Sequence, residues 1–215
     1  MSSNQTDTSS NKWLSLFIKR IMDIVLCTMV LLITLPLLLI MPILVKLSSP
    51  GRVFFLQKRA GREMKSFEVI KFRTMKTNLS AQSTVWSKEE EERITSIGRF
   101  LRDYGLDELP QLWNILKGDM SIIGPRAMLE ETAISIPEQY RSIFRMRPGV
   151  LSLAVIAGRR TIPMEKRIEL HAQYVEEWSL ALDFKILWKS LFVVLFRQDA
   201  NEVLSPLPTD KTETK

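Results

Sequence analysis

The longest apolar stretch of the chain lies near its N-terminus and carries no charged residue. It covers residues 24–45, with Pro36 near its middle, and it is long enough for a helix to cross a bilayer. Lysines and arginines flank both ends, whereas a straight span normally has an excess on one side. Because a proline removes a backbone donor and kinks a helix, we expect a re-entrant helix that bends at Pro36 and returns. A straight span is the alternative.

The residues just before this stretch have the spacing of an amphipathic helix. Trp13 belongs to this segment, and tryptophan is typical of the membrane interface. We therefore expect residues 12–46 to form an interfacial lead-in followed by the re-entrant membrane helix. Residues 1–11 are polar and are expected to be disordered.

Beyond the apolar stretch, the pattern predicts one cytoplasmic-face domain over residues 47–200. β-prone residues predict two short strands within 53–75, with Gly61 in the turn. Helical spacing predicts helices over residues 95–104, 108–117, 128–142 and 164–177. The apolar run at 150–157 indicates an extended segment. The fold class is therefore α/β, mainly helical with a small sheet.

The richly apolar segment 178–197 also carries charges. Asp183, Lys185 and Lys189 would be costly inside a bilayer. With Trp178 and Trp188 as anchors, the segment is expected to be an amphipathic helix on the membrane surface, and a core helix of the soluble domain is the alternative. Two polar segments complete the chain, a solvated loop expected at 77–93 and a mobile tail at 201–215.

Composition narrows the choice of partners. The formal net charge is +6, and basic residues gather just after the apolar stretch, where anionic headgroups attract them by about 1 kcal/mol each. No nucleic-acid motif accompanies this charge, so membrane lipid is the expected partner and nucleic acid is not. The single cysteine, Cys27, excludes an intrachain disulfide. With one histidine, His171, a Ser-His-Asp system is poorly supported.

Carboxylates therefore carry the expected chemistry. Asp107 and Glu108 are adjacent at the start of a predicted helix, where the helix dipole favours their ionised forms. An ionised aspartate can attack phosphorus, and its neighbour can bind Mg²⁺. On spacing alone, the commoner reading is an N-cap aspartate followed by an acidic first turn.

Fixed cations accompany the carboxylates. Arg126 and Arg147 lie in the turns GPR and RPG, and Lys71 and Arg73 lie on the predicted strand KFRTM. Guanidinium groups at rigid turns suit bidentate phosphate binding. Each cation alone is commonly a surface charge, but together with the carboxylate pair they suggest phosphate chemistry on a lipid carrier.

These motifs resemble the bacterial sugar transferase family. The matching segments are KFRTM at 71–75, LDELPQLWNILKGDMSIIGPR at 106–126 and RPG at 147–149. The resemblance extends from about Lys19 to Arg197. It implies a monotopic phosphoglycosyl transferase of the bacterial inner membrane whose active site faces the cytoplasm.

The resemblance also implies a reaction. A sugar-1-phosphate passes from a UDP-sugar to undecaprenyl phosphate, UMP is released, and a phosphosugar is held covalently on Asp107. Glu108 is expected to bind Mg²⁺, and Arg126 to contact phosphate. Downstream glycosyltransferases of polysaccharide assembly are expected partners, and a homodimer is left open.

Several residues depart from the family pattern. Leu35 precedes the proline where serine is usual, Ala127 replaces a proline, and His171 replaces an aspartate. After RPG, the usual Trp, Gln and Asn are replaced by Leu153, Val155 and Ala157. These changes motivate a second hypothesis, a catalytically silent membrane scaffold, although the dyad and Arg126 are retained. The sugar itself is not revealed by the sequence.

Overall fold

The computed structural model describes residues 4–76, 91–157 and 162–196, with side chains from 13 to 191 outside the two internal gaps. The predictions for residues 1–3, for most of the loop at 77–93 and for the tail at 201–215 lie outside the described residues. The domain predicted over 47–200 is divided between two compact units. The first unit comprises Met1–Lys19, Ala60–Lys65 and Ser121–Lys215, and the second comprises Arg20–Arg59 and Ser66–Met120.

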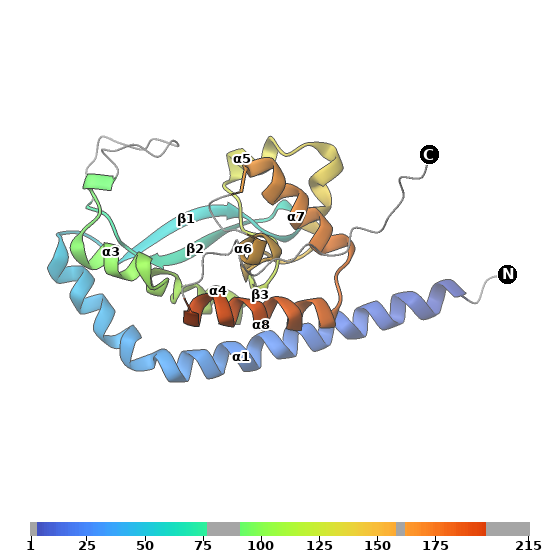
Figure 1. The fold of residues 1–215 in the computed structure, drawn as a ribbon, viewed down its shortest axis with the longest axis horizontal. Helices are drawn as coiled ribbons and strands as arrows, with labels where there is room; N and C mark the ends of the chain where they lie inside the picture. Colours follow the sequence, from blue (N-terminus) through green and yellow to red (C-terminus); the bar gives the residue numbers. More distant parts are fainter. Residues whose placement is uncertain (1–3, 77–90, 158–161, 197–215) are drawn as a thin grey trace. The chain divides into compact units, whose positions relative to one another are not determined.

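Helix α1, Asn4–Ser48, contains the whole apolar stretch (Figure 1). It includes residues 4–11, which were expected to be disordered, because adding residues to an existing helix is easier than starting one. The helix continues through Pro36 and Pro42 and bends in its light blue part, as prolines cause. Within the described residues it is long and apolar enough to cross a membrane. The return of the chain at Pro36 stays a prediction.

The second unit is built on a β-hairpin and three short helical segments. Strands β1, Phe54–Ala60, and β2, Ser66–Phe72, form a two-stranded sheet, as predicted. Helix α3, Ser96–Asp103, begins at Thr95, whose side chain accepts a hydrogen bond from the Gly98 N–H. A 3₁₀ turn, η2, Leu106–Glu108, and helix α4, Gln111–Lys117, follow. The helix predicted over 108–117 thus begins later, because Pro110 serves as its N-cap and has no N–H to donate.

Helix α4 is fixed at its middle and at its C-terminal end by polar side chains. The Asn114 side chain accepts from the Ile70 N–H (3.1 Å) and donates to the Glu68 carbonyl (2.7 Å), so it joins α4 to β2. Arg20 of α1 donates to the carbonyls of Ile115 (2.7 Å) and Leu116 (3.0 Å). Carbonyls in the last turn of a helix lack the usual intrahelical partners, and the Ile115 carbonyl also accepts from the Gly118 N–H (3.0 Å). The guanidinium group therefore stabilises the C-terminal end of the helix.

The first unit contains a parallel pair of short strands and the C-terminal helices. Strand β3, Ser121–Ile123, pairs with β4, Gly149–Leu151, in the register Ser121 to Gly149. The remaining elements are the turn η1, Arg62–Met64, the helix α5, Glu130–Ile134, the 3₁₀ helix η3, Glu138–Arg145, and the helices α6, Leu153–Ala157, α7, Met164–Glu176, and α8, Leu180–Phe196.

Two predictions for this unit need correction. The helix expected over 128–142 is interrupted at Pro137, which separates α5 from η3 and disfavours helical backbone in the residue before it. The extended segment expected at 150–157 is β4 followed by helix α6. The Ser152 hydroxyl accepts a hydrogen bond from the Val155 N–H (3.3 Å) and so begins that helix. The helices predicted at 164–177 and 178–197 are confirmed as α7 and α8.

A buried charge pair joins α1 to α8 within the first unit. Lys19 Nζ lies 2.7 Å from Asp183 Oδ2 and donates to the Ile123 carbonyl at 2.9 Å. The Tyr174 hydroxyl (2.7 Å) and the Trp178 indole N–H (3.2 Å) also donate to the Asp183 carboxylate. Asp183 therefore has a partner for each oxygen, as a buried charge requires.

Helix α8 has one buried face and one apolar exposed face. Asp183, Ile186 and Ser190 are buried, whereas Phe184 and Trp188 are exposed. Ile186 belongs to a core cluster with Ile123 and Tyr174, so the helix contributes to the core as one alternative expected. Its place on a membrane surface stays a prediction.

Replacing Asp183 by asparagine is expected to destabilise the protein strongly. The change leaves the Lys19 ammonium group buried without a counter-charge, and breaking one side of such a pair costs about 3–5 kcal/mol. The unfolding temperature in detergent should fall by about 10 °C or more. The exposed Lys185→Gln on the same helix is the control, and equal unfolding temperatures for both variants would contradict the argument.

Replacing Gly149 by alanine is expected to separate β3 from β4. A Cβ atom on Gly149 would lie 2.0 Å from the Gly124 nitrogen and 2.6 Å from the Ile123 carbonyl carbon, and these are backbone atoms. Gly105→Ala is the control, because its Cβ would meet nothing within 4 Å and would cost only the strain of its positive φ, about 1 kcal/mol. Hydrogen exchange at the Ser121 and Gly124 amides should increase in the Gly149 variant alone. Unchanged protection there would refute the clash.

Candidate active site

The carboxylate pair lies on a short, sharply turned segment of the second unit. Asp107 and Glu108 belong to the 3₁₀ turn η2, which starts after Gly105 at φ 67°. This left-handed conformation is one that glycine adopts without strain. Both carboxylate residues are partly exposed, so substrate can reach them.

Two flanking leucines hold this turn in place. Leu106 and Leu109 pack against a buried cluster of Met41, Val45, Phe72 and Leu101. Met41 and Val45 belong to the C-terminal part of α1. The apolar helix therefore supplies part of the surface on which the carboxylate turn rests.

The electrostatics of Asp107 differ from the expectation based on a helix dipole. Burial raises the pKa of the Asp107 carboxyl above its ordinary value, because a partly desolvated carboxylate is less stable than a hydrated one. The Lys71 ammonium group opposes this and lowers the pKa, while the neighbouring Glu108 charge raises it. Among the groups that lower the pKa of Asp107, Lys71 has the largest effect and Arg102 the next.

Lys71 also forms an ion pair with the second carboxylate. Its Nζ atom lies 2.5 Å from Glu108 Oε1, and both side chains are about one quarter exposed. Asn114 binds the β2 backbone at Glu68 and Ile70, directly before Lys71. Sequence reasoning missed Asn114 as a positioning residue, although it lies in the motif that carries the resemblance.

Arg73, the other cation of this strand, lies in a different environment. It is 6% exposed, and its guanidinium group donates to the carbonyls of Pro50 (2.8 Å), Ser49 (2.5 Å) and Val45 (3.3 Å). These bonds fasten β2 to the C-terminal end of α1. The structure gives Arg73 a structural role, and we leave it out of the proposed phosphate contacts.

The two arginine turns lie in the first unit and are held together by their backbones. The Gly149 N–H donates to the Pro125 carbonyl (2.8 Å), and the Ser121 N–H donates to the Pro148 carbonyl (2.9 Å). Arg126 itself forms a parallel bridge with Gly149. The structure therefore brings together the turns of Arg126, which is exposed, and Arg147, which is half-buried.

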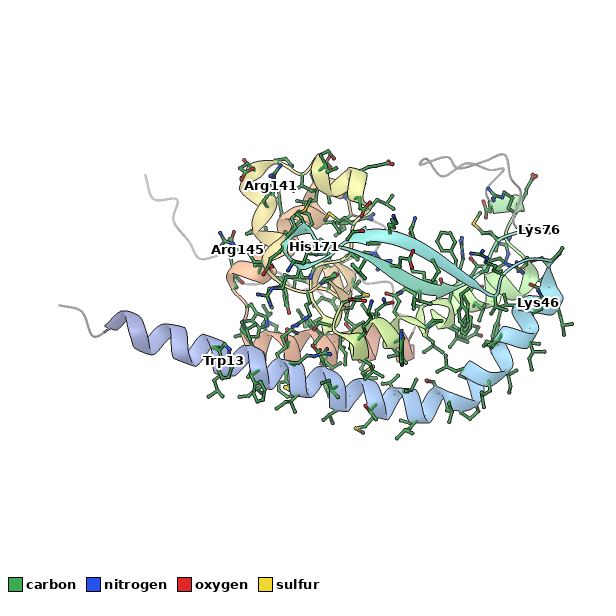
Figure 2. The ribbon with its side chains drawn as sticks, turned by 180° about the vertical axis from the view of Figure 1, so that it is seen from behind. Trp13, Lys46, Lys76, Arg141, Arg145 and His171 are labelled. Carbon is green, nitrogen blue, oxygen red and sulfur yellow. The ribbon has the colours of Figure 1, made fainter. Side chains whose placement is uncertain are left out.

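His171 lies in the interior of the first unit, whereas Arg141 and Arg145 lie at its surface (Figure 2). Burial and the nearby charges of Arg126 and Arg167 lower the pKa of His171 to about 4. The ring is therefore neutral at pH 7. Its Nδ1 atom has no hydrogen-bond partner among the residues that the structure describes.

Four further departures from the family pattern, Ala127, Leu153, Val155 and Ala157, are accommodated by packing, whereas Leu35 is exposed on α1. Leu153 belongs to the same core cluster as Ile123 and Tyr174, and Ala127 is buried. Val155 and Ala157 are partly buried on α6. Leu153, Val155 and Ala157 maintain an apolar helix at this place.

The donor set suits a hard cation bound mainly by substrate. Within the described ranges no group of three or more His, Cys, Asp and Glu side chains could hold a metal alone. Asp107 and Glu108 supply two carboxylates in one turn, and Mg²⁺ takes one or two carboxylates together with phosphate oxygens and water. The residues present therefore fit Mg²⁺.

Known proteins resemble this chain over most of its length. A UDP-glucose:undecaprenyl-phosphate glucose-1-phosphate transferase of Escherichia coli is 41% identical over 187 residues, which cover 81% of this chain and 39% of that protein. The uncharacterized sugar transferase EpsL of Bacillus subtilis is 37% identical, with 84% and 88% coverage. The exopolysaccharide production protein ExoY of Sinorhizobium fredii is 34% identical, with 80% and 83% coverage.

The chain spans about two fifths of the length of the Escherichia coli protein and of a similarly named transferase from Klebsiella pneumoniae. The sequence model of the family described as bacterial sugar transferase matches residues 14–197. Since this match covers most of the chain and EpsL is covered almost completely, the chain belongs to the bacterial sugar transferase family.

Proposed function

We propose that this protein transfers a sugar-1-phosphate from a UDP-sugar to undecaprenyl phosphate and releases UMP. The observation that carries the proposal is the turn η2, where Asp107 lies partly desolvated beside Lys71 and Glu108. The names of the relatives support the substrate class, since three of them are UDP-glucose:undecaprenyl-phosphate glucose-1-phosphate transferases.

Asp107 acts as the nucleophile in the first step. A carboxylate oxygen attacks the phosphorus that carries the sugar, and the bond from this phosphorus to the bridging oxygen breaks. UMP leaves with the bridging oxygen and its electron pair, and a sugar phosphate remains bound to Asp107 as an acyl phosphate. Burial that raises the pKa of Asp107 also makes the ionised carboxylate a more reactive base.

Undecaprenyl phosphate is the acceptor in the second step. One of its phosphate oxygens attacks the phosphorus of the acyl phosphate, and the bond to the Asp107 oxygen breaks. The products are undecaprenyl diphosphate sugar and the restored carboxylate. Neither step needs an oxidant or a reductant.

Phosphate binding to a carboxylate requires cations that counter the repulsion between the negative charges. Lys71 lies beside both carboxylates, and Arg126 and Arg147 are proposed to bind substrate phosphate through their guanidinium groups. Mg²⁺ held by Glu108 would supply further neutralisation of charge on the phosphates. Glu108, the second carboxylate of the turn, would be the protein ligand of Mg²⁺.

The acceptor's long chain requires an active site at a membrane surface. We propose that α1 holds the protein in the bacterial inner membrane with the site facing the cytoplasm. The leucines that flank the dyad pack on α1, which supports a site close to the point where this helix leaves the apolar region.

Replacing Asp107 by asparagine is expected to abolish transfer without lowering stability. UMP release should fall on the order of 1,000-fold or more, because the nucleophile is lost. The raised pKa means that the ionised Asp107 carboxyl is less favourable in the folded protein than in the unfolded one. At a pH above the pKa values of both states, this charge lowers the free energy of unfolding, and a neutral amide removes the effect. The unfolding temperature at pH 7 should be equal or higher.

The assay uses membranes with a panel of UDP-sugars, Mg²⁺ and undecaprenyl phosphate. Asp103→Asn, an exposed acid on α3, is the matched control. Unchanged UMP release by the Asp107 variant would refute the nucleophile assignment. Failure of the unsubstituted protein to release UMP from any donor would instead favour the scaffold hypothesis.

Replacing Lys71 by methionine is expected to move the acid limb of the pH–rate profile to higher pH. Lys71 lowers the pKa of Asp107, so its removal raises that pKa and protonates the nucleophile at a higher pH. The profile of kcat/KM for UMP release measures this directly. Lys117→Met, an exposed lysine on α4, is the control, and an acid limb that stays in place or moves to lower pH would contradict the prediction.

A further inference from the structure

Strand β1 begins with three consecutive large apolar residues that are exposed. Phe54, Phe55 and Leu56 expose 46%, 46% and 47% of their surface, and we call them the hairpin ridge. Successive side chains of a strand point to opposite faces, so apolar side chains are exposed on both sides of β1 here. Soluble proteins seldom expose apolar side chains in such a continuous row.

The hairpin ridge is continuous with the C-terminal part of α1. The Phe54 ring stacks on Phe72 with centroids 5.6 Å apart, and Phe72 is buried against Met41 and Val45 of α1. Leu47, in the last turn of α1, is 78% exposed. Exposed apolar surface therefore extends from the end of the membrane helix to the start of the sheet.

Three exposed cations accompany this apolar surface. Lys46 precedes Leu47 and lies at the end of α1 (Figure 2), Arg52 lies before the ridge and Lys58 after it. The Lys46 ammonium group donates to the Gly51 carbonyl (3.0 Å), which holds the connecting turn close to the helix end. Apolar anchors among cations are the arrangement by which proteins bind anionic bilayers.

We propose that the hairpin ridge and Leu47 insert into the headgroup region of an anionic bilayer, with Lys46, Arg52 and Lys58 contacting lipid phosphates. The inference rests on the proposed place of α1 in the membrane and adds a second contact made by the sheet. Because β2 carries Lys71 directly before Phe72, this contact sets the height of the Lys71–Glu108 pair above the lipid.

A bilayer fits this surface better than a second copy of the chain. The outer edge of β1 has no neighbouring strand within the described residues, and such edges can pair with another chain. A symmetric pairing would bring the same cations together from both copies, which is unfavourable. Anionic headgroups have the opposite charge.

The test places a fluorescent label on the ridge. The single native cysteine is removed as Cys27→Ser, which can retain the hydrogen bond to the Leu112 carbonyl (3.3 Å). A bimane label is then attached to Phe55→Cys, or to Ser66→Cys as the matched control. Ser66 is the exposed first residue of β2 and lies about 15–20 Å along the hairpin from Phe55. Full-length protein is reconstituted in phosphatidylcholine vesicles with or without phosphatidylglycerol, carrying brominated acyl chains as quencher.

The label at position 55 is expected to lose most of its fluorescence in vesicles that contain phosphatidylglycerol, and the label at 66 to retain it. Adding Arg52→Glu and Lys58→Glu should reduce quenching at 55. Equal, weak quenching at both positions would overturn the proposal. A dimer contact would also overturn the proposal. It would be recognised by a label that is shielded from water and not quenched by the lipid, with energy transfer between labelled copies. No sugar donor is used, so this outcome is independent of the transferase assay.

Discussion

Burial of Leu106 and Leu109 determines where the turn of Asp107 and Glu108 lies. Each fully buried leucine contributes about 1.5–3 kcal/mol, and these two partly buried side chains lie on either side of the carboxylate pair. Their partners include Met41 and Val45 of α1, so the same apolar helix that suits a membrane also supports the turn of Asp107 and Glu108. A change in the C-terminal part of α1 would therefore alter the active turn as well as the anchor.

The partial burial of this turn makes the ionised form of the Asp107 carboxyl group less stable. Burial raises the pKa of Asp107, and Lys71 offsets part of that effect. A carboxylate fully solvated in water would ionise easily but react slowly with a charged diphosphate, whereas the pKa of one buried without Lys71 would be raised further. The pKa of Asp107 between these two limits depends on where Lys71 lies. Asn114 fixes that place, because its amide holds α4 against β2 directly before Lys71.

Periodicity predicted the elements that carry a regular pattern. The two strands and the helices α3, α7 and α8 are present where expected. Pro137 interrupted one predicted helix, and Ser152 converted an apolar run into a short helix, because caps and prolines override hydrophobic pattern locally. The carboxylate pair was found from its motif, but the environment of Arg73 was not, since its three carbonyl partners become neighbours only through folding. The ion-pair partner of Asp183, Lys19, is 164 residues away, which no local pattern reveals.

The two cations before the apolar stretch make contacts with segments that are distant in the sequence. In sequence, Lys19 and Arg20 look like a basic flank that attracts lipid headgroups. In the structure, Lys19 binds the Ile123 carbonyl, directly before Gly124 and the turn of Arg126. Arg20 caps α4, the helix that follows the carboxylate turn. Adjacent residues of one helix thus stabilise, each within its own unit, the segment next to an active-site motif. The charge that would orient α1 in a membrane is therefore also the charge that orders the segments proposed to be catalytic, so a substitution at either position would alter both the flank of α1 and the fold of these segments.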